Sequence, residues 1–180
     1  MSAAGGWRRD DDPILKQLIR SSQRLFVSPT ARFYGALSSI KLGDGVRIDD
    51  GVKIVATGDL VIGPDTHIGA YSVINSEGGI HVGRAVQISA HCCIYSSSSV
   101  YDELREALPG VFSRRNEKGL VIIDDFAVIG AQCVVLPKTQ IGKGAGIGAG
   151  SVVRGQVPSF EVWAGTTARK MRDVRIIKGT

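Results

Sequence analysis

Aliphatic residues recur at every sixth position through most of this chain of 180 residues. The register is interrupted by two insertions of two residues and by one long insertion. Its fifteen members are Leu42, Ile48, Ile54, Ile62, Ile68, Ile74, Val82, Ile88, Ile94, Ile123, Ile129, Val135, Ile141, Ile147 and Val153. Small or β-branched residues stand four positions after most of them, and glycine often follows the aliphatic residue directly. This period is typical of a parallel β-helix built from hexapeptide repeats.

Three hexads complete one coil, so fifteen hexads predict an all-β, parallel β-helix of about five coils. Both short insertions follow the third hexad of a coil and enlarge the same corner. The long insertion, at residues 95–120, leaves from that corner and predicts one protruding loop. Each coil presents an aliphatic ladder that only its neighbours can bury, so the ends of the β-helix need caps.

A short N-terminal helix over Pro13–Phe26 is expected to form the first cap. Asp12 can cap its first turn, Pro13 fits that turn, and apolar residues follow at helical spacing. We therefore divide the chain into a helical cap at 1–40, the β-helix at 41–157 and a basic C-terminal segment at 158–180.

Composition narrows the classes of function. Hydrophobic residues make up 43% and charged residues 22%, as in an ordinary soluble protein, and no apolar run reaches the ~18 residues of a membrane span. The net charge is +5, and residues 154–180 carry six basic against two acidic groups, which favours an anionic ligand. An aromatic content of 6% and the absence of a stacking motif argue against nucleic acid. Three cysteines fit a reducing cytoplasm better than a disulfide framework.

Two stretches extend the argument beyond the repeat. Ile129–Val153, with its Ile-Gly-Ala and Ile-Gly-Ala-Gly-Ser hexads, resembles the last coils of sugar O-acetyltransferases. Ala164–Arg172 resembles their closing segment, with Thr167 in place of the usual proline. Over residues 40–175 the chain is similar to hexapeptide-repeat acyltransferases, above all to maltose, galactoside and polysaccharide-cluster O-acetyltransferases. The resemblance implies a left-handed β-helix and a homotrimer that binds acetyl-CoA between adjacent prisms, with the protruding loop over the site.

The resemblance further implies transfer of acetyl from acetyl-CoA to a sugar hydroxyl, in the biosynthesis of surface polysaccharide (lipopolysaccharide or capsule). Two alternatives stay open: an N-acetyltransferase acting on a nucleotide-linked amino sugar, and a non-catalytic β-helix scaffold. A zinc enzyme of the gamma carbonic anhydrase type has the same fold, but the spacing of the three histidines does not resemble that family. No metal is therefore expected.

Acyl transfer to a hydroxyl or amine needs a base that accepts the acceptor's proton, a hydrogen-bond donor that stabilises the oxyanion, and contacts that hold the thioester in place. Histidine is the usual base near neutral pH. His67 is our preferred candidate because the register turns it outward on a flat face. His91, at a corner one coil beyond Tyr71, is the second candidate, and His81, on another face, is the third. Ser99 occupies the place where the maltose and galactoside enzymes carry their catalytic histidine.

Other candidates follow from the same matches. Tyr71, Ser99 and the loop carboxylate Asp102 are expected to contact the acceptor, and Glu103 could orient a base. Cys92 and Cys133 fall in the inward column and read as core residues, whereas Cys93 points outward. The positions expected to bind coenzyme A are Gly130, Ala131, Gly148, Ala149, Arg154, Arg169 and Arg172. Val128 stands where the family has a tryptophan.

Overall fold

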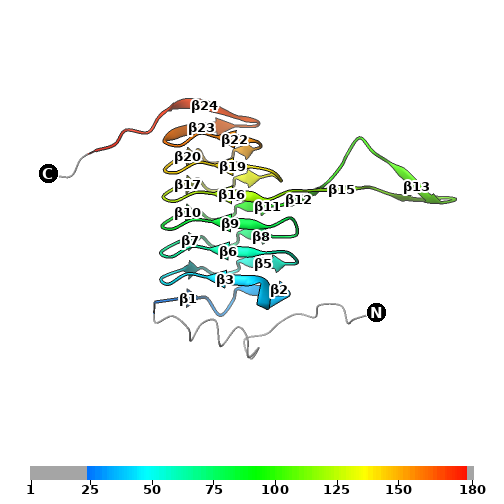
Figure 1. Cartoon of the computed structure of the whole chain (residues 1–180), viewed down its shortest axis with the longest axis horizontal. Coiled ribbons are helices and arrows are strands. Elements are labelled where there is room, and N and C mark those ends of the chain that lie inside the picture. Colours follow the sequence, from blue (N-terminus) through cyan, green and yellow to red (C-terminus); the bar gives the residue numbers. More distant parts are fainter. Residues whose placement is uncertain (1–23, 178–180) are drawn as a thin grey trace.

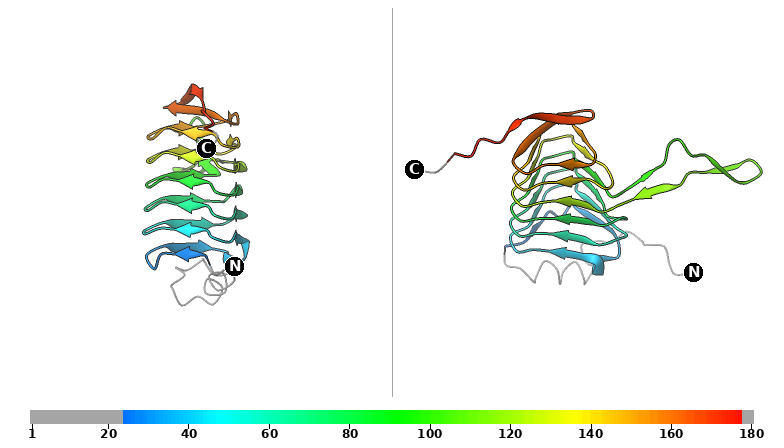
Figure 2. Two further views of the ribbon diagram at one scale, coloured as in Figure 1. Left: turned by 90° about the vertical axis from the view of Figure 1, so that its left-hand side faces the viewer. Right: turned by 45° about the horizontal axis from the view of Figure 1, so that its top comes forward.

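The structure, a computed structural model, describes residues 24–177. Short strands wind around a triangular prism, and each strand pairs in parallel with the strands one coil before and one coil after it (Figure 1, Figure 2). The parallel β-helix predicted from the six-residue period is confirmed.

The prism has three faces, each a parallel sheet. The first face contains β1 (Phe26–Val27), β4 (Arg47–Ile48), β7 (His67–Ile68), β10 (Gln87–Ile88), β17 (Val128–Ile129), β20 (Gly146–Ile147) and β23 (Glu161–Gly165). The second face contains β2 (Arg32–Gly35), β5 (Lys53–Ala56), β8 (Val73–Asn75), β11 (Cys93–Tyr95), β18 (Val134–Val135) and β21 (Val152–Val153). The third face contains β3 (Ile40–Leu42), β6 (Leu60–Ile62), β9 (Ile80–Val82), β16 (Val121–Ile123), β19 (Gln140–Ile141) and β22 (Gln156–Val157).

The number of coils differs from the prediction. Instead of five, the chain forms six complete coils, and β23 begins a seventh. The additional turns lie at both ends, where Phe33 is buried in the first coil and Trp163 packs against the core of the last one. Aromatic residues replace aliphatic ones at these two places, and the buried Val157 follows Val153 after four positions instead of six, so a search for aliphatic residues at a strict six-residue period misses these turns.

The N-terminal cap also needs a correction. The first coil occupies residues 26–42, most of which the sequence assigned to the helical cap at 1–40. Phe26, the predicted last residue of the helix over Pro13–Phe26, lies in β1. Residues 13–23 of that helix lie outside the described residues. Within residues 24–177, the single helical element is the 3-10 turn η1 (Leu37–Ser39), and no helix there is long and apolar enough to cross a membrane.

The core consists of the side chains that point into the prism and stack from one coil to the next. Ile68 and Ile88 are fully buried on consecutive coils, and the same holds for Cys92 and Cys133, as expected for core residues. Hydroxyls inside the prism satisfy the corner backbone: Thr66 Oγ1 donates to the Gly83 carbonyl at 2.8 Å and accepts from the Val86 N–H at 3.1 Å. Because buried polar groups need partners, these bonds hold adjacent coils in register.

The corner between the first and second faces puts one residue of each coil from the second to the sixth in the left-handed region. Tyr71 (φ 60°) and His91 (φ 61°) occupy this position in consecutive coils. In the preceding coil the position belongs to Gly51 (φ 66°), and a Cβ there would lie 2.5 Å from the Tyr71 ring. Glycine at this place therefore makes room for the ring above it.

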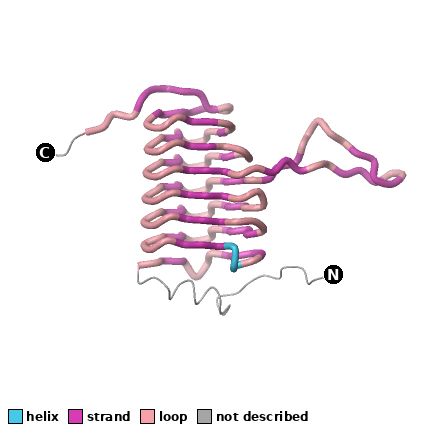
Figure 3. The backbone as a smooth tube through the Cα atoms, in the orientation of Figure 1, coloured by secondary structure: helices cyan, strands magenta, loops and turns pink. Residues whose placement is uncertain are grey.

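The protruding loop is a long hairpin that extends away from the prism (Figure 1, Figure 3). Its stalk pairs β12 (Ser97–Ser99) with β15 (Asn116–Lys118), and its outer part pairs β13 (Arg105–Leu108) with β14 (Val111–Ser113), both antiparallel. The loop predicted at 95–120 is thus a hairpin with two paired parts.

The C-terminal end of the prism is covered by β23 and β24 (Ala168–Asp173), which pair antiparallel. Glu161 joins them, since its carboxylate accepts from Trp163 Nε1 at 2.8 Å and from Lys170 Nζ at 2.7 Å. The basic side chains of the C-terminal segment are therefore carried by a strand that closes the core.

Candidate functional site

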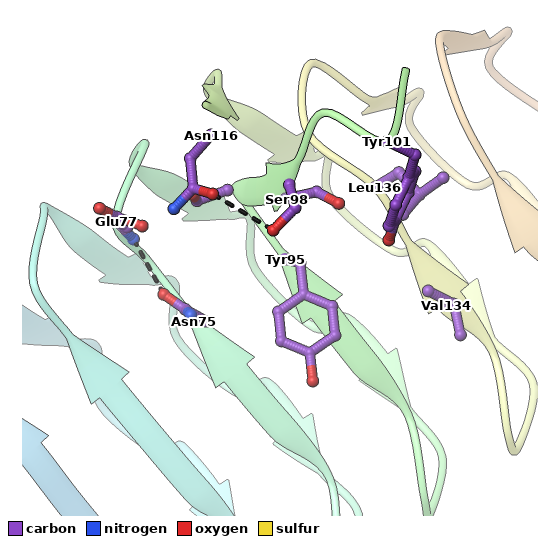
Figure 4. Close-up of a pocket in the computed structure, with 10 residues that line it drawn as sticks. Asn75, Glu77, Tyr95, Ser98, Tyr101, Asn116, Val134 and Leu136 are labelled. Carbon is purple, nitrogen blue, oxygen red and sulfur yellow. Dashed lines mark hydrogen bonds between the residues drawn. The ribbon is translucent and has the colours of Figure 1, made fainter. Parts of the chain in front are cut away.

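A pocket of about 340 Å³ opens where the protruding loop leaves the second face (Figure 4). We call it the loop-root pocket. It is lined by Asn75, Glu77, Tyr95, Ser97, Ser98, Ser99, Tyr101, Asn116, Val134 and Leu136. Three successive coils and both strands of the stalk contribute to it, so it depends on the pairing of β12 with β15 at the root of the loop.

The six-residue period turns the pocket side chains outward. Asn75 and Tyr95 follow the buried Ile74 and Ile94, and they are register partners in β8 and β11. Since successive residues of a strand point to opposite sides, both side chains face solvent. Opposite them, Ser99 Oγ donates to Asn116 Oδ1 at 3.3 Å across the stalk. Ser99, predicted to contact the acceptor, does line the pocket.

Among the described residues that line the pocket, Glu77 is the one with a charged side chain. Lys118 Nζ lies 2.7 Å from Glu77 Oε1. The hydrogen bond from Lys118, followed by that from the Ser97 hydroxyl, lowers the pKa of the Glu77 carboxyl. The pocket therefore contains one carboxylate, ionised at neutral pH, among neutral hydroxyl and amide groups.

Glu117, the residue before Lys118 on the stalk, forms ion pairs with residues of later coils. Glu117 Oε1 lies 2.7 Å from Lys138 Nζ, and Glu117 Oε2 lies 3.3 Å from Arg154 Nη2. The hydrogen bond from Lys138 is the main cause that lowers the pKa of Glu117. Arg154, expected to bind coenzyme A, is thus engaged by the root of the loop.

His67 lies on the first face, as predicted, and is part of a separate polar cluster. Its Nε2 is 2.8 Å from Asp49 Oδ2, and Arg47 Nε donates to Asp49 Oδ1 at 2.7 Å. Partial burial alone would raise the pKa of the Asp49 carboxyl, but the hydrogen bonds from Arg47 and His67 lower it overall. The structure does not bring His67 and Ser99 together within one chain, because they border different faces.

His91 and Tyr71 do border the second face, at the edge opposite the pocket. Their rings are stacked, with centroids 5.3 Å apart and planes 13° apart. Tyr71 and Asn75 are four positions apart, a distance of roughly 13 Å in an extended chain. His81 is exposed on the third face.

The loop carboxylates lie outside the pocket. Asp102 is exposed. Glu103 is held by Arg115 at 2.7 Å and by Arg105 at 3.1 Å, and the hydrogen bond from Arg115 is the main reason that its pKa falls to about 2. Neither residue lines the pocket, so the structure offers no contact between them and an acceptor bound there.

The predicted coenzyme A positions fall into two groups. Gly130–Ala131 and Gly148–Ala149 occupy the same corner in consecutive coils, where Gly130 N–H donates to the Ile147 carbonyl at 2.8 Å. A Cβ at Gly130 would lie 2.5 Å from the Ala149 nitrogen, so stacking of coils already requires this glycine. Arg169 and Arg172 are exposed on β24 near this end, whereas Arg154 lies at the loop corner.

Within residues 24–177, no group of three or more His, Cys, Asp or Glu side chains could hold a metal ion.

The sequence analysis did not find Asn75, Glu77, Tyr95, Asn116 or Asp49. Three of them could have been found. Asn75 and Tyr95 directly follow members of the aliphatic ladder next to the exit of the loop, and Asp49 stands where other hexads carry glycine. The contribution of Asn116 depends on how the loop returns, which the period does not specify.

Three comparisons place the chain among known proteins. Residues 121–155 match the family described as bacterial transferase hexapeptide (six repeats). The dTDP-4-amino-4,6-dideoxy-D-glucose acyltransferase of Escherichia coli is 34% identical over 150 residues, which are 82% of this chain and 78% of that protein. AntD, an N-acyltransferase from Bacillus cereus solved with dTDP and 3-hydroxybutyryl-CoA, is 26% identical with a TM-score of 0.79, covering 89% of this chain and 87% of its own.

A more distant structure shares the fold alone. The maltose O-acetyltransferase from Clostridium difficile 630 is 20% identical with a TM-score of 0.61, covering 94% of this chain and 80% of its own. A mutant of AntD has also been solved with dTDP-4-amino-4,6-dideoxyglucose and coenzyme A together.

Proposed function

Because this chain belongs to the hexapeptide-repeat transferases, a family of acyltransferases, we propose that it transfers an acyl group from a coenzyme A thioester to the amino group of a nucleotide-linked amino sugar. The observation that carries the proposal is the similarity over most of both chains to the E. coli enzyme, whose name states an acyl transfer to such a sugar. The complexes of AntD with dTDP and with coenzyme A or an acyl-CoA support both substrate classes.

This choice reverses the order in which the sequence ranked the acceptors. The O-acetyltransferase interpretation rested on the resemblance to maltose and polysaccharide-cluster enzymes. The matched maltose enzyme is only 20% identical, which supports a common fold and no more. The N-acyltransferase alternative is therefore the better supported one, with acetyl-CoA as the simplest donor.

The reaction sets the requirements for the site. The amine nitrogen attacks the thioester carbonyl carbon, the carbon–sulfur bond breaks, and an amide and a free thiol form. An acceptor that arrives as an ammonium first loses one proton to a base, and a second proton moves from nitrogen to sulfur. His67 can supply the base: a neutral ring that donates Nε2–H to Asp49 leaves Nδ1 as the nitrogen that accepts a proton.

We assign the sugar to the loop-root pocket. Tyr101 and Leu136 provide apolar surface, and the Asn75 and Ser98 side chains provide hydrogen-bonding groups, which is the mixture that sugars require. The thioester then extends toward the C-terminal coils, along Gly130, Ala131, Gly148 and Ala149, with Arg169 and Arg172 placed for its phosphates.

A homotrimer of left-handed prisms completes this proposal. The pocket lies on the second face and His67 on the first face, so one chain cannot use both at a single acceptor. Cyclic packing that puts the second face of one prism against the first face of the next brings His67 of the partner subunit toward the pocket. We also propose that the protein works in the cytoplasm, as the low cysteine content predicts.

The test compares two acceptors that differ in one group. The purified protein is given acetyl-CoA with dTDP-4-amino-4,6-dideoxy-D-glucose, or with the same nucleotide sugar carrying a hydroxyl at carbon 4, and thiol release is followed. We expect kcat/KM to be at least about 100-fold higher for the amine. Equal values, or a preference for the hydroxyl, would overturn the proposal.

A further inference from the structure

We propose that Glu77 is the residue that selects an amine over a hydroxyl, because its carboxylate binds the acceptor's amino group in the loop-root pocket. This inference rests on the proposed function, since it names the group that recognises the proposed substrate.

The first argument is the charge inside the pocket. Of the described lining residues, Glu77 alone is charged, and the others offer hydroxyl, amide or apolar surface. Its side chain is 30% exposed, so it is partly removed from water but can still be reached. A primary ammonium brings three donors and a positive charge to this carboxylate, whereas a hydroxyl brings one donor and no charge. The neutral lining groups cannot make that distinction.

The second argument is the way in which the carboxylate is held. Lys118 contacts Oε1 from the stalk, and Ser97 donates a hydrogen bond from the start of β12. A carboxylate has about four lone-pair sites, so these two partners leave capacity for a ligand. They also fix the orientation of the group, which lowers the entropy cost of binding an amine there.

The third argument is the position of Glu77 in the pocket. Asn75 Oδ1 accepts from the Glu77 backbone N–H at 3.3 Å, so the turn that carries Glu77 is braced by another lining residue (Figure 4). The carboxylate stands at the corner where β8 ends and the loop of the next coil leaves. A sugar that fills the pocket therefore contacts the Glu77 carboxylate on the wall that the prism contributes to the pocket.

The test is Glu77→Gln, which keeps the shape and a hydrogen-bonding oxygen but removes the charge. We expect kcat/KM for the amino sugar to fall about 10- to 100-fold, mainly through KM, while kcat/KM for the hydroxyl analogue changes less than about twofold. Affinity for coenzyme A, measured by calorimetry, should be unchanged and shows that the fold is intact. The control is Asp59→Asn, which removes an exposed carboxylate from the same corner one coil earlier, outside the pocket. It should behave as wild type.

An equal loss for the amine and the hydroxyl acceptors, or no loss for either, would overturn the role of Glu77. Calorimetric binding of both nucleotide sugars separates this result from failure of the proposed function. If the wild type binds the amino sugar more tightly and Glu77→Gln abolishes that preference, Glu77 is the selecting group even without turnover. If the wild type binds both sugars equally, the inference is wrong.

Discussion

Nζ of Lys138 lies 2.7 Å from Oε1 of Glu117, so the strand that returns from the protruding loop is tied to the next coil of the prism. The next residue of the same strand, Lys118, forms an ion pair with Glu77 in the coil that precedes the loop. The stalk is therefore held by ion pairs to the coils on both sides of it, and Glu77, in one of these pairs, lines the loop-root pocket.

Glu117→Gln should loosen the root of the loop without unfolding the prism. The pairs of Glu117 with Lys138 and Arg154 are exposed, and such pairs contribute little to global stability. We expect an unchanged denaturation midpoint, faster proteolytic cleavage within the loop at 97–118, and a KM for the acceptor that rises several-fold. Asp59→Asn is the matched control. Equal cleavage rates in both variants would show that the ion pairs of Glu117 do not hold the root of the loop.

Glu103 should titrate far below an ordinary glutamate. The hydrogen bond from Arg115 is the largest cause that lowers its pKa from 4.5 to about 2. A carboxyl whose pKa is lower in the folded state stabilises that state above its unfolded pKa, so this stabilisation is lost as pH falls from 4.5 toward 2.

Carboxyl chemical shifts at low salt should give the Glu103 midpoint directly. Arg115→Gln should move the midpoint back toward 4.5, and salt should move it in the same direction by screening. A wild-type midpoint near 4.5 at low salt would show that the pair does not persist in solution.

Gly51→Ala should cost more stability than Gly155→Ala. Both glycines have a positive φ, 66° and 80°, so alanine pays a backbone cost of about 1 kcal/mol at either place. At Gly155 the added Cβ meets nothing within 4 Å, but at Gly51 it lies 2.5 Å from the Tyr71 ring. Displacing that ring disrupts its stacking on His91, which adds about 1 kcal/mol. Urea denaturation of the two variants measures the difference, and equal costs would show that the Tyr71–His91 stack contributes nothing.

His67→Ala should lower kcat by about 10²- to 10⁴-fold if His67 is the base. The control is His81→Ala, because His81 is exposed on the third face and should be dispensable. Asp49→Asn should give a smaller loss, since it alters the orientation of the ring and leaves the imidazole in place. Full activity in His67→Ala, with loss in His91→Ala, would transfer the role of base to His91.

The sequence was sufficient for the fold because one physical requirement repeats along the chain: every sixth side chain must fill the prism. Ile68 and Ile88 follow that rule and are buried as predicted. Phe33 and Trp163 satisfy the same requirement with aromatic rings, so the aliphatic pattern began only at the end of the first coil and stopped before the last turn.

The site was harder to predict because it joins residues that the period does not relate. Ser99 could be found, since it holds a defined place after Ile94. Glu77 and Asn116 come together through the pairing of β12 with β15, and that register depends on contacts of the stalk such as Lys118 with Glu77. The outward position of His67 was predicted correctly, but the pocket forms on another face.

The most direct test of the central claim is the identity of the product formed from acetyl-CoA and dTDP-4-amino-4,6-dideoxy-D-glucose. Mass spectrometry and mild alkaline treatment distinguish an amide from an ester. The account predicts one acetyl group on the sugar nitrogen, stable to alkali, with one coenzyme A thiol released for each product. An alkali-labile ester, or thiol release without an acetylated sugar, would contradict it.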